Sequence, residues 1–227
     1  MSDRKPHHLG HRDRLRRRFL ATPGDSFADY ELLELVLCSA LPRGDVKPLA
    51  KQLLARFGSF AEVISAEPAR LKETDGIGPA TIAAFKVVRV AALRLSRAAV
   101  LGQPVVSSWD ALIDYCQASM AYEKTEQFRI LFLDRKNVLI TDEVQQKGTV
   151  DHTPVYPREV MKRALDLGAS ALIMVHNHPS GDPTPSHADI EITNQIREAG
   201  RNLGITLHDH LVIGKGTYSS FKTMGLL

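Results

Sequence analysis

The sequence predicts an α/β protein in two parts: a small all-helical N-terminal domain over residues 1–101, then a domain with a mixed sheet over residues 102–227. Three observations support this division. Apolar residues in the first part recur at helical spacing, and none of its runs alternates with a period of two. Gly102 and Pro104 then interrupt the pattern. After them, short apolar runs alternate with helical segments, which is typical of α/β domains.

Capping residues divide the helical part into short segments. Ser26 precedes a segment in which four apolar side chains share one helical face: Leu32, Leu33, Val36 and Leu37. The other expected helices are 46–57, capped by Asp45 and ended by Gly58; 60–65, capped by Ser59; a short helix starting at Glu67 and Pro68; and a long helix from Pro79 to about Arg97.

The second part predicts the element order βαββαβαββ. The expected elements are a short strand from Val105, a helix over 107–120 with Ser107 and Asp110 at capping-box spacing, a hairpin over 127–149 with its turn at 134–137, a helix over 157–168, a buried strand over 169–175, a helix over 186–200, and strands over 204–214 and 217–221. Pro157 suits the first position of its helix, and Gly168 suits the position after its end.

The composition of the 227 residues is that of a globular protein, with 44% hydrophobic and 24% charged residues. The opening stretch lacks the apolar segment of a signal peptide, and no apolar run approaches the ~18 residues of a membrane span. Cys38 and Cys116 lie outside any CxxC spacing, so they supply neither a disulfide framework nor a metal site. We therefore expect a cytoplasmic protein with no membrane partner.

Charge is distributed unevenly along the chain. Residues 1–102 hold 17 Lys and Arg against 11 Asp and Glu, whereas residues 103–227 hold 12 against 15. The basic part could contact a polyanion. The alternative is that its basic stretch, residues 11–19, is the solvated face of an amphipathic helix.

Gly76 and Gly78 enclose Ile77 between two helical segments. Two glycines let the chain reverse within a few residues and leave the backbone N–H groups of the second helix open to a phosphate. Residues 66–97 thus resemble the helix-hairpin-helix DNA-binding motif, whose contacts would be sequence-independent and sensitive to salt. Nearby positive charges are Lys72, Lys86 and Arg89. The alternative is a tight turn that only packs a helical bundle.

The stretch "VHNHPSGDPTPSHAD" follows an apolar strand and opens a helix. His176 and His178 are two residues apart at the strand end, so both side chains can point to one face. Pro179 and Gly181 turn the chain, and the helix start brings Asp189 back. Two imidazoles and one carboxylate make three ligands and leave a fourth tetrahedral position for water, the arrangement of a catalytic zinc.

Each of these pieces also has a structural explanation. A single HxH pair is common, and Ser186 with Asp189 fits a capping box without any metal. Four other polar residues of this part are interpreted as turn, surface or strand residues: Asp182, His187, His208 and His210.

The spacing H-x-H-x7-S-x2-D matches the JAMM signature of the JAB/MPN metalloproteases at His176, His178, Ser186 and Asp189. With "KGTVDHTPVYPREVMKRAL" upstream and the helix-hairpin-helix region ahead of it, the chain resembles the bacterial RadC family over nearly its whole length. The resemblance implies a three-layered α/β/α, cytidine-deaminase-like JAB/MPN domain. It also implies one Zn²⁺ per chain, with His176, His178 and Asp189 as its ligands.

JAMM enzymes also use a glutamate from an upstream strand, and the candidate here is Glu143 in the expected hairpin. Glu143 would take a proton from water and pass it to the leaving amine, and Ser186 would hydrogen-bond the oxyanion. Asp142 should face the other side of the strand. Glu159 is expected to complement a helix dipole.

The expected function is a zinc metallopeptidase or isopeptidase that acts on a protein or peptide, with DNA contact through the N-terminal domain. One alternative is a metal-dependent DNA hydrolase, although the sequence offers no second acidic cluster. The other is a non-catalytic DNA-binding scaffold with a structural zinc, which would need a fourth protein ligand such as His208 or His210.

Overall fold

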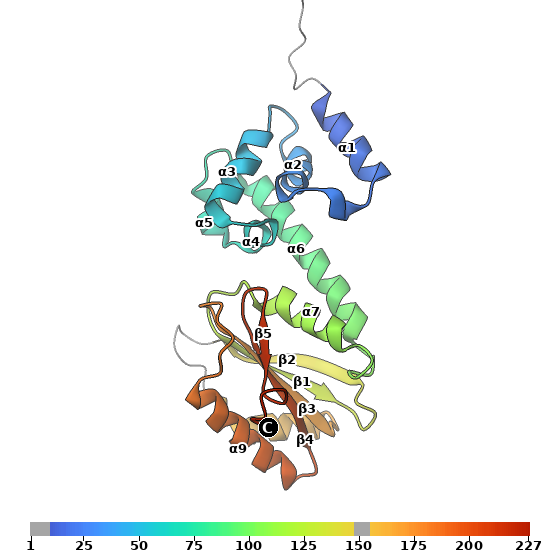
Figure 1. Ribbon diagram of the computed structural model, residues 1–227, viewed down its shortest axis with the longest axis vertical. Helices are drawn as coiled ribbons and strands as arrows, with labels where there is room; N and C mark the ends of the chain where they lie inside the picture. Colours follow the sequence, from blue (N-terminus) through green and yellow to red (C-terminus); the bar gives the residue numbers. More distant parts are fainter. Residues whose placement is uncertain (1–9, 148–154) are drawn as a thin grey trace, which may run out of the picture. The chain divides into compact units, whose positions relative to one another are not determined.

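The computed structural model describes residues 10–147 and 155–227 (Figure 1). The prediction of a helical part followed by an α/β part with a mixed sheet is confirmed. Two compact units are present, one ending at Ala91 and one beginning at Ala92. This division falls inside helix α6 (Pro79–Val100), ahead of the boundary expected at residues 101 and 102. Among the described residues, no helix combines the length and hydropathy needed to cross a membrane.

The described residues of the first unit form helices joined by short turns. The helices are α1 (His11–Ala21), α2 (Asp29–Ala40), α3 (Lys47–Phe57), α4 (Phe60–Ser65), α5 (Pro68–Lys72) and the first part of α6, with a 3-10 turn over Gly24–Ser26. Their apolar faces enclose a core whose largest members are fully buried: Leu33, Leu37, Leu53, Leu71 and Phe85. Burial of these side chains is the main stabilising contribution to the unit.

Of the three expected side-chain caps in this unit, the one by Ser59 forms: its hydroxyl caps α4. The N-cap of α3 is Val46, which has no side-chain cap; Asp45 precedes it and accepts the Lys47 N–H. Gly58 ends α3 with a φ of 105°, a conformation that glycine adopts without strain. Ser26 does not cap α2, because its hydroxyl donates to the Pro23 carbonyl just before the 3-10 turn and α2 begins later, at Asp29.

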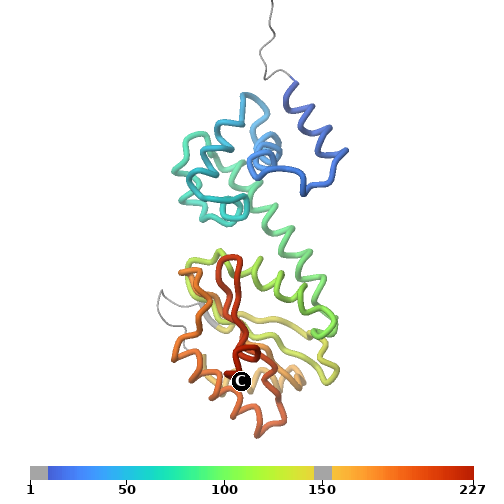
Figure 2. Tube along the Cα trace, viewed as in Figure 1, coloured from blue at the N-terminus to red at the C-terminus, as the bar shows by residue number. Residues whose placement is uncertain are grey.

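The second unit carries a five-stranded sheet in the order β2-β1-β3-β4-β5. Its elements are α7 (Trp109–Met120), β1 (Gln127–Leu133), β2 (Leu139–Lys147), α8 (Pro157–Asp166), β3 (Ala171–Asn177), α9 (His187–Arg201), β4 (Thr206–Ile213) and β5 (Tyr218–Ser220). β1 pairs antiparallel with β2 and β3, β3 pairs parallel with β4, and β4 pairs antiparallel with β5. α9 is the crossover between β3 and β4, and the chain can be followed through it in Figure 2.

Helices cover both faces of this sheet, α7 on one side and α8 with α9 on the other (Figure 1). Leu131 and Ile173 belong to the apolar cluster under α7, whereas Phe132 and Met174 belong to the cluster under α8 and α9. Because both faces are covered, β3 is buried along its whole length. The expected three-layer arrangement is therefore present, and polar side chains on β3 lie in a largely dry environment.

Two expected details at the start of the second part are wrong. Val105–Val106 does not begin a strand: Pro104 forms an isolated bridge, and the neighbouring backbone bonds to the turn between β1 and β2. Ser107 and Asp110 do not form a capping box, since the serine hydroxyl donates back to the Pro104 carbonyl and α7 begins without a side-chain cap. The chain here folds around the end of the hairpin instead.

Asp142 forms a buried charged cluster on the α7 face of the sheet. Its carboxylate accepts hydrogen bonds from Tyr115 at 2.6 Å and Arg97 at 2.8 Å, and a further one from Arg129. Burial alone would raise the pKa of Asp142, but the hydrogen bonds from Tyr115 and Arg97 outweigh burial and hold the pKa below its ordinary value. Asp142 thus faces the side of the sheet opposite Glu143, as expected.

Asp142→Asn is expected to destabilise the fold by about 3 kcal/mol at pH 7, because it leaves buried arginine charge uncompensated. Since the native pKa is depressed, the carboxylate contributes stability above its unfolded pKa of ~3.9 and loses it as pH falls through the lower native value. Urea unfolding of both proteins between about pH 3 and 8 measures this. The difference should be constant near neutrality and shrink below about pH 4; a difference that does not change with pH would contradict the assignment.

Candidate metal centre

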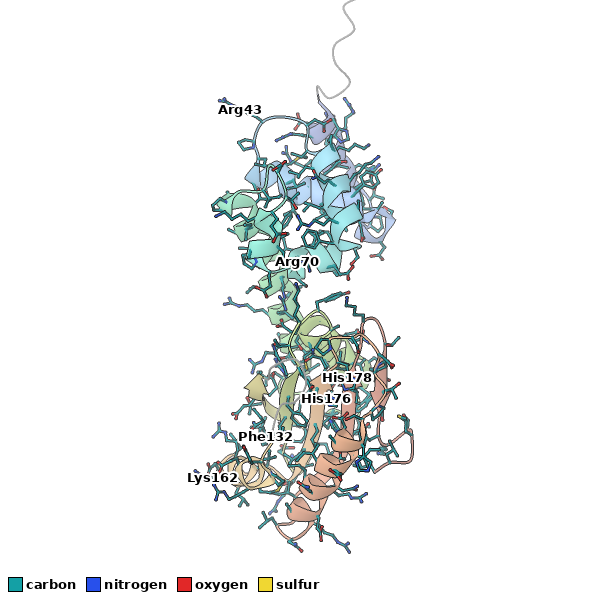
Figure 3. The ribbon with its side chains drawn as sticks, turned by 90° about the vertical axis from the view of Figure 1, so that its left-hand side faces the viewer. Arg43, Arg70, Phe132, Lys162, His176 and His178 are labelled. Atoms are coloured by element: carbon teal, nitrogen blue, oxygen red, sulfur yellow. The ribbon has the colours of Figure 1, made fainter. Side chains whose placement is uncertain are left out.

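Three ligand-forming side chains meet where β3 ends. His176 lies on β3 and His178 follows its end, and both appear close together in Figure 3. α9 begins with His187, and its first turn carries Asp189. The Nε2 atoms of the two strand-end histidines lie 3.0 Å apart. The Asp189 carboxylate lies 3.2 Å from Nε2 of His176 and 3.6 Å from Nε2 of His178. The expected convergence of His176, His178 and Asp189 is therefore confirmed.

These distances fit a single tetrahedral ion. Zinc binds histidine nitrogen and carboxylate oxygen at ~2.0–2.2 Å, which places two tetrahedral ligands about 3.4 Å apart. Within residues 10–147 and 155–227, these three residues form the one group of at least three such ligands, with all ligand atoms within 4.8 Å of one another. His176 is fully buried, whereas the His178 side chain is 19% exposed. The cluster can hold a cation and opens toward solvent on the His178 side.

A backbone carbonyl fixes the protonation of His178. Its Nδ1 atom lies 2.8 Å from the carbonyl oxygen of Asp182, which can only accept a hydrogen bond. Nδ1 therefore carries the proton, and Nε2 keeps its lone pair for a metal. The carboxylate of Asp182 accepts the N–H of Thr184 at 2.9 Å, so Asp182 is the turn residue that the sequence predicted. The stiff loop thus orients a ligand as well as reversing the chain.

The three candidate ligands are also coupled electrostatically. Burial opposes ionisation of Asp189, but the adjacent imidazoles of His176 and His178 outweigh burial and hold the pKa of Asp189 far below its ordinary value. The neighbouring Asp189 carboxylate in turn raises the pKa of His178 against the effect of burial. The site therefore keeps a fixed negative charge in a half-buried position, which favours a bound cation.

Ser186 orients Asp189 and begins α9 at the same time. Its hydroxyl donates to Asp189 Oδ2 at 2.6 Å and accepts the Asp189 N–H at 3.2 Å, and its own N–H donates to the same Oδ2 at 2.7 Å. This is the capping box that the S-x-x-D spacing predicted. Because Oδ2 is occupied by these bonds, Oδ1 is the oxygen best placed for a metal. An oxyanion could receive the Ser186 hydroxyl hydrogen only after Asp189 released it.

Glu143, the glutamate expected at the site, lies elsewhere. It is paired with Ile130 of β1, which is paired in turn with Met174 of β3. Because β1 separates β2 from β3, two strand spacings of about 4.8 Å lie between Glu143 and the histidine strand. Arg163 of α8 holds the Glu143 carboxylate through Nε at 2.9 Å and Nη2 at 2.6 Å. The structure places Glu143 in a partly exposed ion pair and does not bring it to the cluster.

A different glutamate, Glu126, is near enough to His178 for its charge to act on that ring. Phe128 of β1 is paired with His176 at the end of the ladder, and the segment that precedes it runs on past Asn177 toward His178. After the larger effect of Asp189, the negative charge of Glu126 also helps to raise the pKa of His178. Glu126 is thus a carboxylate outside the three candidate ligands whose charge acts on the cluster.

Asn177, between the two histidines, fastens the segment that carries Glu126. This side chain is buried, and its Oδ1 accepts the Gln127 N–H at 2.9 Å. Its Nδ2 donates to the carbonyls of Thr125 at 3.3 Å and Glu123 at 3.4 Å. One buried amide therefore holds the backbone on both sides of Glu126 and ties it to β3.

Comparison with known proteins identifies the family of this domain. Residues 106–226 match the family model of the RadC-like JAB domain. The chain belongs to the RadC family. It is 64% identical over 213 residues to a UPF0758 protein of Rhodobacter capsulatus, an overlap that covers 94% of this chain and 100% of that protein. It is 58% identical over 217 residues to a UPF0758 protein of Ruegeria pomeroyi, covering 96% of this chain and 97% of that protein. The resemblance seen in the sequence is thus confirmed.

In this RadC-like domain, the loop after β3 packs against the turn between β4 and β5. The Lys215 N–H donates to the Gly181 carbonyl at 3.3 Å, and the His178 N–H donates to the Ile213 carbonyl at 3.0 Å. A Cβ atom on Gly214 would overlap with the Gly181 carbonyl oxygen. Only glycine at position 214 therefore lets the histidine loop approach the turn this closely.

Gly214→Ala is expected to push the histidine loop away from β4 and to weaken metal binding through His178. The zinc dissociation constant should rise about tenfold or more, as it does when a group that orients a ligand is lost. Chelator competition measures the effect. Gly24→Ala is the control, since a Cβ there meets nothing within 4 Å. Equal zinc affinities for Gly214→Ala and the unaltered chain would show that the loop absorbs the added carbon.

Of the residues predicted to contact DNA, some lie at the turn before α6, whereas Lys86 bonds to backbone within the helical unit. Ile77 is buried beneath the turn, Gly76 adopts a φ of 86°, and the Lys72 side chain is exposed. The Lys86 ammonium instead donates to three carbonyls at the end of α4, the shortest bond being 2.6 Å. Lys86 therefore caps a helix C-terminus within its own unit. DNA contact by Gly76, Gly78 and Lys72 stays a prediction.

Proposed function

We propose that this RadC protein is a zinc-dependent hydrolase of peptide or isopeptide bonds. The observation that carries the proposal is the cluster of His176, His178 and Asp189, with the charge of Glu126 acting on His178. Three protein ligands, a neighbouring carboxylate and access to solvent are the features of a catalytic zinc site. When bound there, zinc would supply Lewis acidity toward a scissile carbonyl and activate water.

The protein residues around the cluster have separate proposed roles. Glu126 takes the place of Glu143 as the general base: it accepts a proton from the attacking water and passes it to the leaving amine. Glu143 is less suited, because its carboxylate is engaged in a bidentate bond with Arg163 of α8. Ser186 could donate to the oxyanion while its backbone N–H continues to hold Asp189.

Two alternative functions have less support. A scaffold with a structural zinc would need a fourth protein ligand, but His208 bonds to Asn137 at 2.6 Å, and His210 bonds to Nδ1 of His176, on the side away from the cluster. A DNA hydrolase with paired metals would need a second acidic cluster. The part of the chain that the structure describes contains a single group of metal-ligating residues.

Metal analysis combined with hydrolysis assays on the full-length chain tests the proposal. We expect one zinc per chain and cleavage within a library of peptides and isopeptides, with both lost in His176→Ala. A chain that binds zinc but cleaves no amide bond in the library would contradict the peptidase assignment while leaving the metal site intact. Cleavage of DNA that disappears in His176→Ala would favour the DNA hydrolase instead.

A further inference from the structure

We infer that Thr193 and His210 form a hydrogen-bond relay that fixes His176 in the one tautomer able to bind a metal. Thr193 lies on α9 and His210 on β4, and neither belongs to the ligand cluster. The inference rests on the zinc site of the proposed function, but not on any reaction at that site. Both residues are therefore positioning residues, which act through His176.

The contacts of the relay run from a backbone carbonyl to the ligand. Thr193 Oγ1 donates to the Asp189 carbonyl oxygen at 2.5 Å and lies 2.6 Å from Nδ1 of His210. Nε2 of His210 lies 2.8 Å from Nδ1 of His176. Thr193, His210 and His176 are all buried, with at most 1% of each residue exposed. Hydrogen bonds among buried groups of this kind are costly to leave unmade, so the protons take defined positions.

Counting donors and acceptors places each proton. The carbonyl oxygen can only accept, so the single hydroxyl hydrogen of Thr193 points to Asp189. Thr193 Oγ1 must then accept a hydrogen bond from His210, which puts a proton on Nδ1 of that ring. A neutral imidazole carries one proton, so Nε2 of His210, which faces Nδ1 of His176, is an acceptor. Nδ1 of His176 must donate to it, and Nε2 of His176 keeps its lone pair toward His178 and Asp189.

Aromatic packing keeps the two rings of the relay aligned. The Phe221 ring stacks on His210 with centroids 4.6 Å apart, and Phe128 lies parallel to His176 at 5.7 Å. Because this part of the core is closely packed, neither imidazole can turn over without displacing a buried phenyl ring. The tautomer and the orientation of His176 are thus set before a metal arrives.

Helix α9, which supplies the candidate ligand Asp189, thereby also determines the tautomer of His176. Thr193 lies one helical turn after Asp189, so α9 delivers the Asp189 carboxylate and, through Thr193 and His210, the correct tautomer of His176. Without the Thr193 hydroxyl, the His210 proton would lose its acceptor. His210 and His176 could then reverse their protons together, which would place a hydrogen on Nε2 of His176 and block the metal position.

A pair of Thr193 variants separates the relay from simple packing. Thr193→Val keeps the shape of the side chain and removes the hydroxyl, whereas Thr193→Ser keeps the hydroxyl and removes a methyl group. We expect Thr193→Val to raise the zinc dissociation constant about 10–100-fold, measured by chelator competition, and Thr193→Ser to stay within a few-fold of the unaltered chain. Equal affinities for Thr193→Val and the unaltered chain, or equal losses in both variants, would overturn the relay.

Long-range ¹H–¹⁵N NMR of the metal-free full-length chain gives a second readout that needs no zinc. In the unaltered protein, the proton of His176 should lie on Nδ1; a proton on Nε2 would overturn the inference even if Thr193→Val failed to fold. In Thr193→Val, part of the His176 signal should shift to the Nε2-protonated form. A chain that binds no zinc but shows the expected tautomers would refute the proposed function and leave the relay in place.

Discussion

Glu126→Gln is expected to keep one zinc bound per chain and to lower the rate of amide hydrolysis by about 10²–10⁴-fold, the usual contribution of a general base. Glutamine preserves the size of Glu126 but cannot accept the proton. Zinc content by metal analysis and kcat on the substrate that the unaltered chain cleaves measure the two effects. The pKa of His178 in the metal-free protein should also fall, because the charge of Glu126 helps to raise it.

Glu143→Gln is the matched control, because the same change is made on another strand of the same sheet. Arg163 holds the Glu143 carboxylate on the partly exposed side of β2, so its loss should change kcat and zinc content little. If Glu143→Gln abolished hydrolysis and Glu126→Gln did not, the assignment of Glu126 as general base would be wrong. The expectation drawn from the sequence would then be restored.

The cluster of candidate metal ligands was predictable because the positions of its residues depend on local geometry. Two residues of separation at a strand end put His176 and His178 on one face, and the S-x-x-D spacing fixed Ser186 and Asp189 at the start of a helix. Caps such as Ser59 were predictable for the same reason. Because the motif spans one strand end, one loop and one helix start, the spacing of its residues is enough to predict which side chains converge.

The proposed general base, Glu126, could not be predicted in this way, because its position depends on the order of strands in the sheet. Glu143 is closer in sequence to the histidines, but β1 and not β2 pairs with β3. Glu126 stands just before β1, and because β1 pairs with β3, its charge acts on His178. The only local signal was a carboxylate directly preceding an apolar strand, which is common on protein surfaces and points to no partner.

His210 was interpreted from the sequence as a structural strand residue, and its contact with a ligand was missed. The parallel pairing of β3 with β4 brings it to His176, and a bulge between Leu207 and Asp209 changes the direction of the side chains before it. His208, two residues away, consequently bonds to Asn137 instead. Neither the pairing nor the bulge can be inferred from an H-x-H spacing alone.

Asp189→Asn is expected to raise the zinc dissociation constant by more than about 100-fold. Loss of a group that only orients a ligand typically raises it ~10–100-fold, so loss of a ligand should have the larger effect. The amide retains the shape of the side chain and an oxygen for the Ser186 contacts, so the main loss is the negative charge of a ligand. Asp182→Asn is the control in the same loop, since its carboxylate contacts Thr184 and is not in the cluster. Similar zinc affinities in the two variants would exclude Asp189 as a ligand.

The pH dependence separates ligand loss from a general weakening of the fold. In the metal-free protein, Asp189 raises the pKa of His178. The pair therefore stabilises the fold fully below the unfolded histidine pKa of ~6.5. This contribution is lost as pH rises through the raised pKa of His178 in the folded protein. Zinc affinity follows the opposite trend, because protons compete with zinc for the histidines at low pH. Asp189→Asn should therefore cost the metal-free protein most stability near pH 6, whereas zinc binding by the unaltered chain should strengthen toward pH 8. A stability loss in the metal-free variant that is the same at both pH values would show that Asp189 acts through its helix cap and not through His178.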